Sequence, residues 1–198
     1  MKIHFHLCIE GFTNCYLILN DAPGVKEAVI IDPGKISNDM ITQIEEDHYK
    51  LSAVFITHNH KDHVHGLNTL CKIYSPKIYA AEYSIEGMKT QVLHGDGSIK
   101  VAGLDITYLS VPGHSSDSLV YKIGNVLFTG DTLMSGTIGE TSNLYSKKLL
   151  TSLIEKKILS QTSDTVLMPG HGPPSTVEAE RMFNVDIEPK KEINSICQ

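Results

Sequence analysis

The chain contains, between residues 54 and 63, the stretch Val54-Phe55-Ile56-Thr57-His58-Asn59-His60-Lys61-Asp62-His63. The first part of this stretch is apolar and rich in β-branched and aromatic residues, a composition typical of a buried strand. Three imidazoles and one carboxylate, all potential metal ligands, follow directly. A solvated polar loop is the plainer interpretation of a single histidine, but so many ligands directly after a buried strand predict a metal site.

The spacing within the stretch indicates that its ligand side chains point in two different directions. His58 and His60 are two residues apart, so in an extended chain they point the same way and can bind one ion together. Asp62 and His63 lie past the expected strand end, where a turn would direct them toward a second ion. A helix predicted over residues 66–72 would begin just after His63, with its free amides facing the site.

The composition restricts the class of protein. With 198 residues the chain is long enough for one domain with a sizeable core, and we expect a single domain over residues 1–198. A hydrophobic content of 41% and a charged content of 20% are ordinary for a soluble globular protein. The formal net charge of −6 argues against nucleic acid as a partner.

The remaining global features predict a cytoplasmic protein. No CxxC pair occurs, which favours free thiols in a reducing compartment over a disulfide framework for Cys8, Cys15, Cys71 and Cys197. The N-terminus lacks the apolar core of a signal peptide, and no run approaches the length needed to span a membrane. The oligomeric state stays open at this stage.

Strands and helices are expected in both halves of the chain. Predicted strands cover residues 3–9, 14–19, 28–31, 54–57, 77–81, 126–129 and 165–168, with a hairpin over 99–111 around Ala102-Gly103. Predicted helices cover 37–49, 66–72, 146–159 and 176–184. His4 and His6 share one face of the first predicted strand. His94 is expected to be exposed to solvent. Asp32 is equally well explained as a turn residue or as a hydrogen-bond acceptor that supports a ligand.

Ligand-type residues recur where strands end. His114, Asp131 and His171 each follow a glycine at the end of a predicted strand, where glycine lets the backbone turn sharply and approach a crowded site. Each one alone is weak evidence. Together with the central stretch they form a set of five histidines and two aspartates, enough for two metal ions with open positions, as in catalytic sites. The full set is His58, His60, Asp62, His63, His114, Asp131 and His171.

These motifs resemble those of the metallo-β-lactamase superfamily, and within it the single-domain, glyoxalase II-like (hydroxyacylglutathione hydrolase-like) branch. The motifs are Thr57 to His63, Pro112-Gly113-His114, Thr129-Gly130-Asp131-Thr132 and Pro169-Gly170-His171-Gly172. The resemblance implies an α/β fold, a four-layer αβ/βα sandwich of two mixed β-sheets flanked by helices, with the metals at one edge. It also implies the ligand roles: His58, His60 and His114 for the first metal, Asp62, His63 and His171 for the second, and Asp131 as the bridge.

The expected cofactor is a pair of divalent ions, about 3.5–4 Å apart as in other two-metal hydrolytic sites. Imidazole and carboxylate ligands suit zinc, iron or manganese, and zinc is our first expectation. Two such ions with the catalytic carboxylates Asp62 and Asp131 would keep a net charge of about +2, which favours a metal-bridging hydroxide. The expected function is hydrolysis of a small-molecule thioester of the acylglutathione type, or of a related ester. Ser115 and Ser116 are interpreted as loop hydrogen-bonding residues.

Two departures from the family pattern affect the substrate. Two-domain glyoxalase II enzymes carry a C-terminal helical domain that helps hold glutathione, and we expect none here because only residues 172–198 follow His171. Short relatives commonly have arginine in an Ile-Gly-Arg-Thr-like loop, whereas this chain has Ile138-Gly139-Glu140-Thr141. We therefore expect slow turnover of acylglutathione.

Several other functions compete with thioester hydrolysis. The principal alternative is a mononuclear-iron persulfide dioxygenase, since a sister branch uses the first-metal residues for that oxidation. Lactone hydrolysis fits the same ligands, and phosphodiester cleavage is disfavoured by the acidic charge. β-Lactam hydrolysis is disfavoured by the absence of an export signal, and a non-enzymatic binding module leaves the open ligand set unexplained.

Overall fold

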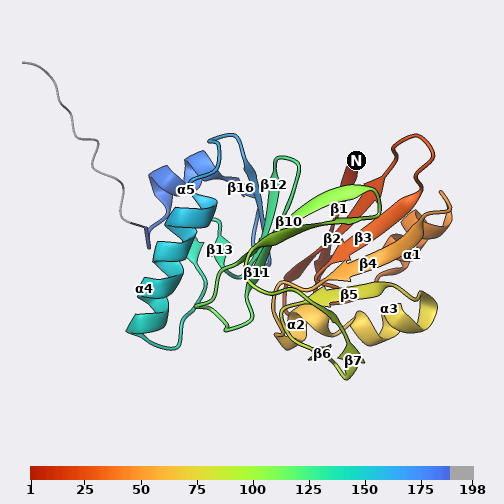
Figure 1. Ribbon diagram of the computed structural model, residues 1–198, viewed down its shortest axis with the longest axis horizontal. Helices are drawn as coiled ribbons and strands as arrows, with labels where there is room; N and C mark the ends of the chain where they lie inside the picture. The colour runs from red at the N-terminus through yellow and green to blue at the C-terminus, as the bar shows by residue number, and fades with distance from the viewer. Residues whose placement is uncertain (188–198) are drawn as a thin grey trace, which may run out of the picture.

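Two six-stranded β-sheets pack face to face, with helices on both outer sides, in the computed structural model of this protein (Figure 1). The structure describes residues 1–187. The N-terminal sheet has the strand order β1-β2-β3-β4-β5-β8, and the C-terminal sheet has the order β16-β15-β12-β11-β10-β9.

The N-terminal sheet and its helices comprise β1 (Lys2–Cys8), β2 (Thr13–Asn20), β3 (Glu27–Ile31), α1 (Asn38–Glu45), β4 (Lys50–Phe55), α2 (Lys61–Val64), α3 (Leu67–Ile73), β5 (Lys77–Ala80) and β8 (Gln91–Val92). The C-terminal sheet and its helices comprise β9 (Gly97–Val101), β10 (Leu104–Ser110), β11 (Leu119–Ile123), β12 (Val126–Gly130), α4 (Leu144–Leu153), the π-helical segment η1 (Ile154–Ile158), β15 (Val166–Pro169), β16 (Ser175–Thr176) and α5 (Val177–Phe183). Short hairpins are formed by β6 (Ser84–Ile85) with β7 (Met88–Lys89) and by β13 (Leu133–Met134) with β14 (Thr137–Ile138).

Three separate hydrophobic clusters define the layers. One lies between the N-terminal sheet and its helices and contains Met40 and Leu67. The next lies between the sheets, where Phe55 packs edge-on against Tyr121 with ring centroids 5.1 Å apart. The last joins the C-terminal sheet to α4 and η1 through residues such as Leu150. Three apolar interfaces separate four layers, which confirms the predicted αβ/βα sandwich of two mixed sheets.

The pairing of the strands brings the motif-bearing loops to one edge. β3, β4, β5 and β8 are parallel, as are β12 and β15, while the remaining neighbours in the two sheets are antiparallel. The loops that follow β4, β12 and β15 meet at one edge of the sandwich, where they bring their His and Asp side chains together. The two sheets are joined there by a hydrogen bond from Leu119 N to Thr57 O of 2.8 Å. Tyr121 adds a second, donating from its hydroxyl to Ile56 O at 2.8 Å.

Most predicted strands are confirmed. The first hairpin pairs β1 with β2 in a register that sets Phe5 opposite Tyr16. The hairpin around residues 102 and 103 is also present, and both Ala102 and Gly103 have positive φ, as a tight turn requires. β11 was missed, because its residues Leu119–Ile123 follow a serine-rich loop without a clear turn signal.

Two helix predictions need correction, and one short helix was not predicted. The first helix is capped by Ser37 as expected but ends at Glu45, and the chain turns at His48, which has a φ of +57°. The helix expected over residues 66–72 is present as α3, but the short helix α2, which begins at Lys61 and contains both Asp62 and His63, was not predicted. The helix over 146–159 divides into α4 and η1. The closing helix α5, capped by Thr176, is close to its prediction.

Two further expectations concern the cysteines and the membrane. Cys8, Cys15 and Cys71 are free thiols, and Cys197 lies outside the described residues. Within residues 1–187, no helix combines the length and the apolar character needed to cross a bilayer.

Candidate metal centre

The seven predicted ligands come together at the sandwich edge although they span residues 58 to 171. β4 ends at Phe55, so His58 and His60 lie in the loop after the strand rather than on its pleated face. Asp62 and His63 come from α2. The other three follow the ends of β10, β12 and β15; they are His114, Asp131 and His171.

The first set of ligand atoms belongs to three histidines. His58 Nε2 lies 3.0 Å from His60 Nδ1, which lies 3.1 Å from His114 Nε2. Asp131 completes the group, its Oδ2 lying 3.9 Å from His58 Nε2 and 3.8 Å from His114 Nε2. All four ligand atoms lie within 4.8 Å of one another.

The second set consists of Asp62, His63 and His171, whose ligand atoms also lie within 4.8 Å of one another. His171 Nε2 is 3.1 Å from Asp62 Oδ2, and His63 Nε2 is 3.8 Å from the same oxygen. Asp131 reaches this set as well, with its Oδ1 3.4 Å from His63 Nε2 and its Oδ2 3.4 Å from His171 Nε2. Its carboxylate therefore lies between the two sets.

The arrangement fits divalent metals. His63 Nε2 and Asp131 Oδ1 are buried and lack a hydrogen-bond partner among the described residues, and a buried polar atom without a partner is costly. The nitrogen separations of 3.0 and 3.1 Å in the first set are near the edge of about 3.3 Å of a tetrahedron with Zn–N bonds of about 2.0 Å. Imidazole and carboxylate donors without thiolate suit zinc, iron or manganese.

Asp32 supports both sets from behind. Its buried carboxylate accepts hydrogen bonds from Thr57 N (2.8 Å), Thr57 Oγ1 (2.6 Å) and His63 Nδ1 (3.0 Å). Thr57 Oγ1 also lies 3.0 Å from His58 Nδ1. Such partners orient ligand imidazoles. Asp32 itself has a φ of +51°, a strained conformation for a non-glycine residue, so the support role is the correct one of the two interpretations left open by the sequence.

Backbone carbonyls orient two other histidines. His114 Nδ1 lies 2.9 Å from Glu140 O, and His171 Nδ1 lies 3.2 Å from Phe12 O. Sequence reasoning missed both contacts because any type of residue can supply a backbone carbonyl acceptor. Ser115 forms a 2.6 Å hydrogen bond with Ser118, in keeping with its predicted loop role.

Glycine is required where the backbone meets the ligands. A Cβ atom on Gly170 would lie 2.3 Å from Asp131 Oδ1 and 2.6 Å from His63 Cε1. Real Cβ atoms essentially never approach other atoms so closely, so any larger residue would displace the ligands. The glycine before His171 thus permits close approach, as expected from the sequence.

Electrostatics differ between the two sets. Burial, together with the neighbouring His63, lowers the pKa of His58 to about 3, and burial also lowers the pKa of His60. Burial opposes protonation of His63 too, but Asp32 and Asp131 outweigh it and raise the pKa of His63 to about 10. The hydrogen bond to Asp131 raises the pKa of His171. At neutral pH without metal, His58 and His60 of the first set are neutral, whereas His63 in the second set carries a proton.

This difference predicts unequal proton release on metal loading. Binding at the first set should release few protons at pH 7, whereas binding at the second set must displace the proton of His63, because only neutral imidazole is a ligand. Second-set affinity should therefore rise with pH toward about 10, the pKa of His63. Zinc titration calorimetry in two buffers of different ionisation enthalpy measures the release for each equivalent. Equal release for both equivalents would contradict the assignment.

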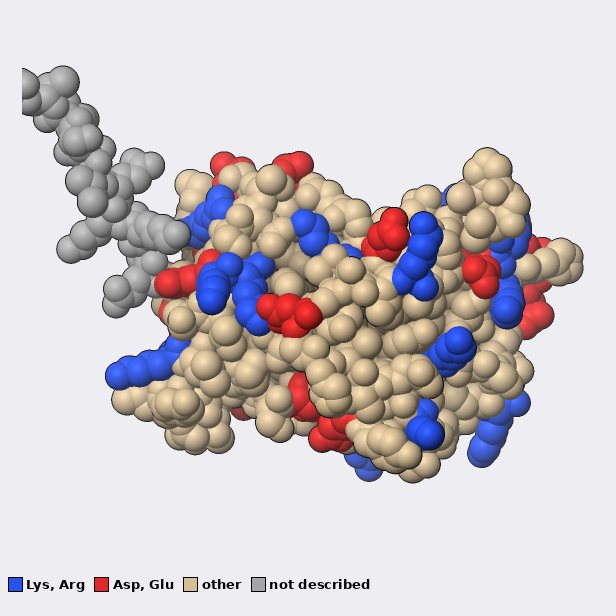
Figure 2. All heavy atoms as spheres, viewed as in Figure 1, with Lys and Arg blue, Asp and Glu red and all other residues tan. Residues whose placement is uncertain are grey.

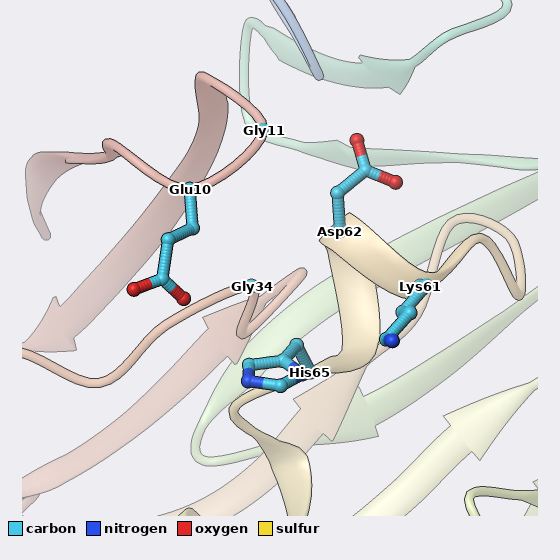
Figure 3. A pocket seen from close by; sticks show the side chains of 6 residues that line it. All are labelled: Glu10, Gly11, Gly34, Lys61, Asp62 and His65. Carbon is cyan, nitrogen blue, oxygen red and sulfur yellow. The ribbon is translucent and has the colours of Figure 1, made fainter.

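Two cavities flank the centre. One of about 360 Å³ is lined by Glu10, Gly11, Gly34, Lys61, Asp62 and His65. Figure 3 shows the Asp62 carboxylate directed away from Lys61 and His65, which also line this cavity. The other, of about 290 Å³, lies beside His114 and is lined by Pro112, Gly113, His114, Ser115, Ser116, Ser142, Ser146 and Leu149. None of the described residues that line it is a lysine or an arginine.

Two His/Asp sets that share one carboxylate, at the edge of an αβ/βα sandwich, define a centre for divalent metals. The family model of the metallo-beta-lactamase superfamily matches residues 8–171, and the chain belongs to this superfamily. Most of its members are metal-dependent hydrolases. The resemblance inferred from the motifs is thereby confirmed.

Two curated relatives have the same sequence identity to this chain, 30%. An uncharacterised protein of Mycobacterium tuberculosis is 30% identical over 210 residues, which cover 88% of this chain and 92% of that protein. The hydroxyacylglutathione hydrolase of Chromohalobacter salexigens is 30% identical over 166 residues, covering 82% of this chain and 64% of that enzyme.

Solved structures share the fold. The BLEG-1 B3 metallo-β-lactamase has a TM-score of 0.80 at 26% identity, covering 93% of this chain and 98% of its own. ETHE1 from Myxococcus xanthus has the same TM-score at 25% identity, covering 93% of this chain and 84% of its own. A metallo-β-lactamase from Staphylococcus aureus has a TM-score of 0.82 at 22% identity, covering all of this chain and 68% of its own. At this identity the similarity shows the fold alone.

Proposed function

We propose that this protein hydrolyses small-molecule thioesters or related esters with two divalent ions, zinc being the expected metal. The observation that carries the proposal is the position of Asp131, whose carboxylate lies within 3.9 Å of ligand atoms in both sets. A shared carboxylate between two ligand sets is suited to two adjacent ions. The similarity to hydroxyacylglutathione hydrolases at 30% identity supports a thioester as the substrate class.

The residues would divide the work as follows. His58, His60 and His114 would hold the first ion, and Asp62, His63 and His171 the second, with Asp131 between them. Divalent ions bound there would lower the pKa of water toward 7 and polarise the carbonyl group of the substrate. Asp62 and Asp131 supply the negative charges of the two sets, and Thr13 orients Asp62 by a hydrogen bond of 3.0 Å. Asp32 accepts a hydrogen bond from His63 Nδ1, which would leave His63 Nε2 free to hold the second ion.

An assay panel tests the function. Protein purified without added metal would be analysed for metal content and assayed on an acylglutathione, an uncharged thioester, a lactone, a β-lactam and a persulfide. We expect thioester or lactone turnover that a chelator abolishes and zinc restores. Absence of turnover of any ester by the zinc-loaded protein would overturn the proposal.

Persulfide oxidation with a single iron is the second candidate. It is supported by the first set, which is complete with three histidines and Asp131, and by the structural similarity to ETHE1 from Myxococcus xanthus. Oxygen consumption with a persulfide by protein that contains one iron and no activity on thioesters would favour it over hydrolysis.

We propose that the substrate carries little charge. Four of the eight residues that line the cavity beside His114 are serines, and the Glu140 side chain is exposed nearby while its carbonyl contacts His114. Lys147, a possible partner for glutathione carboxylates, is engaged with Asp186 at 2.7 Å. Basic and acidic side chains are mixed on the face drawn in Figure 2.

Glu140→Arg tests this substrate preference. We expect the parent to turn over an uncharged thioester at least as well as acylglutathione. The variant should raise kcat/KM for acylglutathione by about tenfold, because an added cation can bind its carboxylates and remote binding energy serves the reacting centre. Steady-state kinetics on both substrates measures this preference. Lys148→Ala is the control that tests whether the exposed lysine on α4 binds the glutathione carboxylates instead. A strong parental preference for acylglutathione that Glu140→Arg leaves unchanged would refute it.

A further inference from the structure

Residues at the start of β2, in the N-terminal sheet, contact Asp62 of α2 and also His171, which follows β15 of the C-terminal sheet. Phe12 O accepts a hydrogen bond from His171 Nδ1 at 3.2 Å, and Thr13 Oγ1 donates to Asp62 Oδ2 at 3.0 Å. Asn14 Nδ2 donates to Pro169 O at 2.9 Å and to Gly172 O at 2.8 Å. Three consecutive residues thus hold two of the three second-set ligands.

Thr13 and Asn14, whose contacts lie beside His171, are buried, whereas the contact between Phe12 O and His171 Nδ1 is exposed. Thr13 is 0% exposed and Asn14 is 1% exposed. The backbone of Asn14 also donates to Gly170 O at 2.7 Å, and Thr13 forms an isolated antiparallel bridge with His171. The Asn14 side chain therefore holds the carbonyls of Pro169 and Gly172, one on each side of His171, and the Tyr16 hydroxyl also donates to Pro169 O, at 2.6 Å.

The preceding turn approaches Asp62 closely. Gly11 has a φ of +90°, and a Cβ atom placed on it would lie 2.7 Å from Asp62 Cβ. Figure 3 shows this turn facing the Asp62 side chain. By contrast, no hydrogen bond from residues 12–14 to His58, His60 or His114 is present in the described part of the chain. The segment therefore acts on one set and not on the other.

We propose that residues Phe12 to Asn14, here called the β2 clamp, set the second metal position and so determine whether the centre holds one ion or two. The inference rests on the two-ion centre of the proposed function. Metal affinity depends on how firmly ligands are held in the bound geometry, and partners of ligands typically contribute 10- to 100-fold. The β2 clamp provides this support for His171 and Asp62 only. Its members are positioning residues rather than catalytic ones.

Zinc binding by two clamp variants tests the inference. Asn14→Ser removes both amide hydrogen bonds around His171, and Thr13→Val removes the hydroxyl that donates to Asp62 while keeping the side-chain shape. Each variant would be titrated with Zn²⁺ in competition with a chromophoric chelator, and its bound metal would be counted. We expect the second equivalent to bind about 10- to 100-fold more weakly and the first to bind as in the parent.

Matched controls separate this effect from a general loss of stability. Asn20 lies on the same strand, is buried, and donates to Ala102 O at 2.8 Å away from both sets, so Asn20→Ser removes a comparable hydrogen bond. Thr165→Val, which removes a hydrogen bond of 3.1 Å to Asn125, is the control for Thr13→Val. Both controls should bind two equivalents like the parent, whatever their melting temperatures. If Asn14→Ser fails to fold, Thr13→Val carries the test alone.

The outcomes distinguish the two proposals. The inference would be overturned if the folded clamp variants bound the second Zn²⁺ equivalent as tightly as the parent, or if Asn20→Ser weakened it equally. In either case a parent that binds two Zn²⁺ equivalents would still support the proposed centre. A parent that binds fewer than two Zn²⁺ equivalents would overturn the centre itself and the clamp with it.

Discussion

Asp131→Ala is expected to empty both metal positions and to lower kcat/KM for the preferred ester by about 10³-fold or more, beyond the 10- to 100-fold typical of residues that only support a ligand. The reason is geometric. The Asp131 carboxylate lies 3.4 Å from both His63 Nε2 and His171 Nε2 and 3.8 Å from His114 Nε2, so it contributes to both sets. Metal analysis and steady-state kinetics measure the two effects.

Two comparison variants make this result specific. His171→Ala should retain the first ion and lose the second, because His171 belongs to one set only. His94→Ala, which alters an exposed histidine outside both sets, should retain both ions and full activity. If Asp131→Ala kept two ions and parental turnover, the shared role of its carboxylate would be wrong.

Asp32→Ala should produce the second large effect, mainly on stability. Its carboxylate, 2% exposed, accepts three hydrogen bonds from Thr57 and His63. Removing one partner from a buried charged pair costs about 3–5 kcal/mol. We expect a loss of that size in the free energy of unfolding of the metal-free protein, measured by denaturant titration. Weaker zinc binding at the second set, by about 10- to 100-fold, should accompany it.

Glu180→Ala is a matched control for Asp32→Ala. Glu180 is also 2% exposed, and its carboxylate accepts hydrogen bonds from Gly136 N at 3.0 Å and Asn184 Nδ2 at 2.6 Å, outside both ligand sets. It should lose comparable stability yet bind zinc like the parent. Asp32→Asn should recover part of the stability, since an amide oxygen can still accept from Thr57 N. Equal zinc binding by parent and Asp32→Ala would contradict the support role.

The fold was largely predictable because its signals are local and repeated. Apolar runs marked most strands, and Ser37 marked the start of α1. β11 lacked such punctuation and was missed. The start of α2 was also missed, because Lys61 follows the histidine loop without a side-chain cap and the helix has four residues. These errors concern boundaries and short elements, where tertiary contacts outweigh local sequence preference.

The candidate site was predictable in its residues but not in its support. Histidines and aspartates after strand ends are visible in a sequence, and the structure brings all seven together. The hydrogen bonds from Asn14 to Pro169 and Gly172, and the carbonyl of Glu140, depend on which loops become neighbours in space. No spacing rule links residue 14 to residue 171, so the β2 clamp could be found only from the folded chain.

Anomalous-scattering crystallography of the zinc-loaded protein tests the central claim most directly, namely that Asp131 joins two adjacent metal positions. We expect two zinc peaks about 3.5–4 Å apart, the usual separation in two-metal hydrolytic sites. One should be bound by His58, His60 and His114, the other by Asp62, His63 and His171, with Asp131 in contact with both. A single peak, or two peaks with Asp131 bound to neither, would contradict the account.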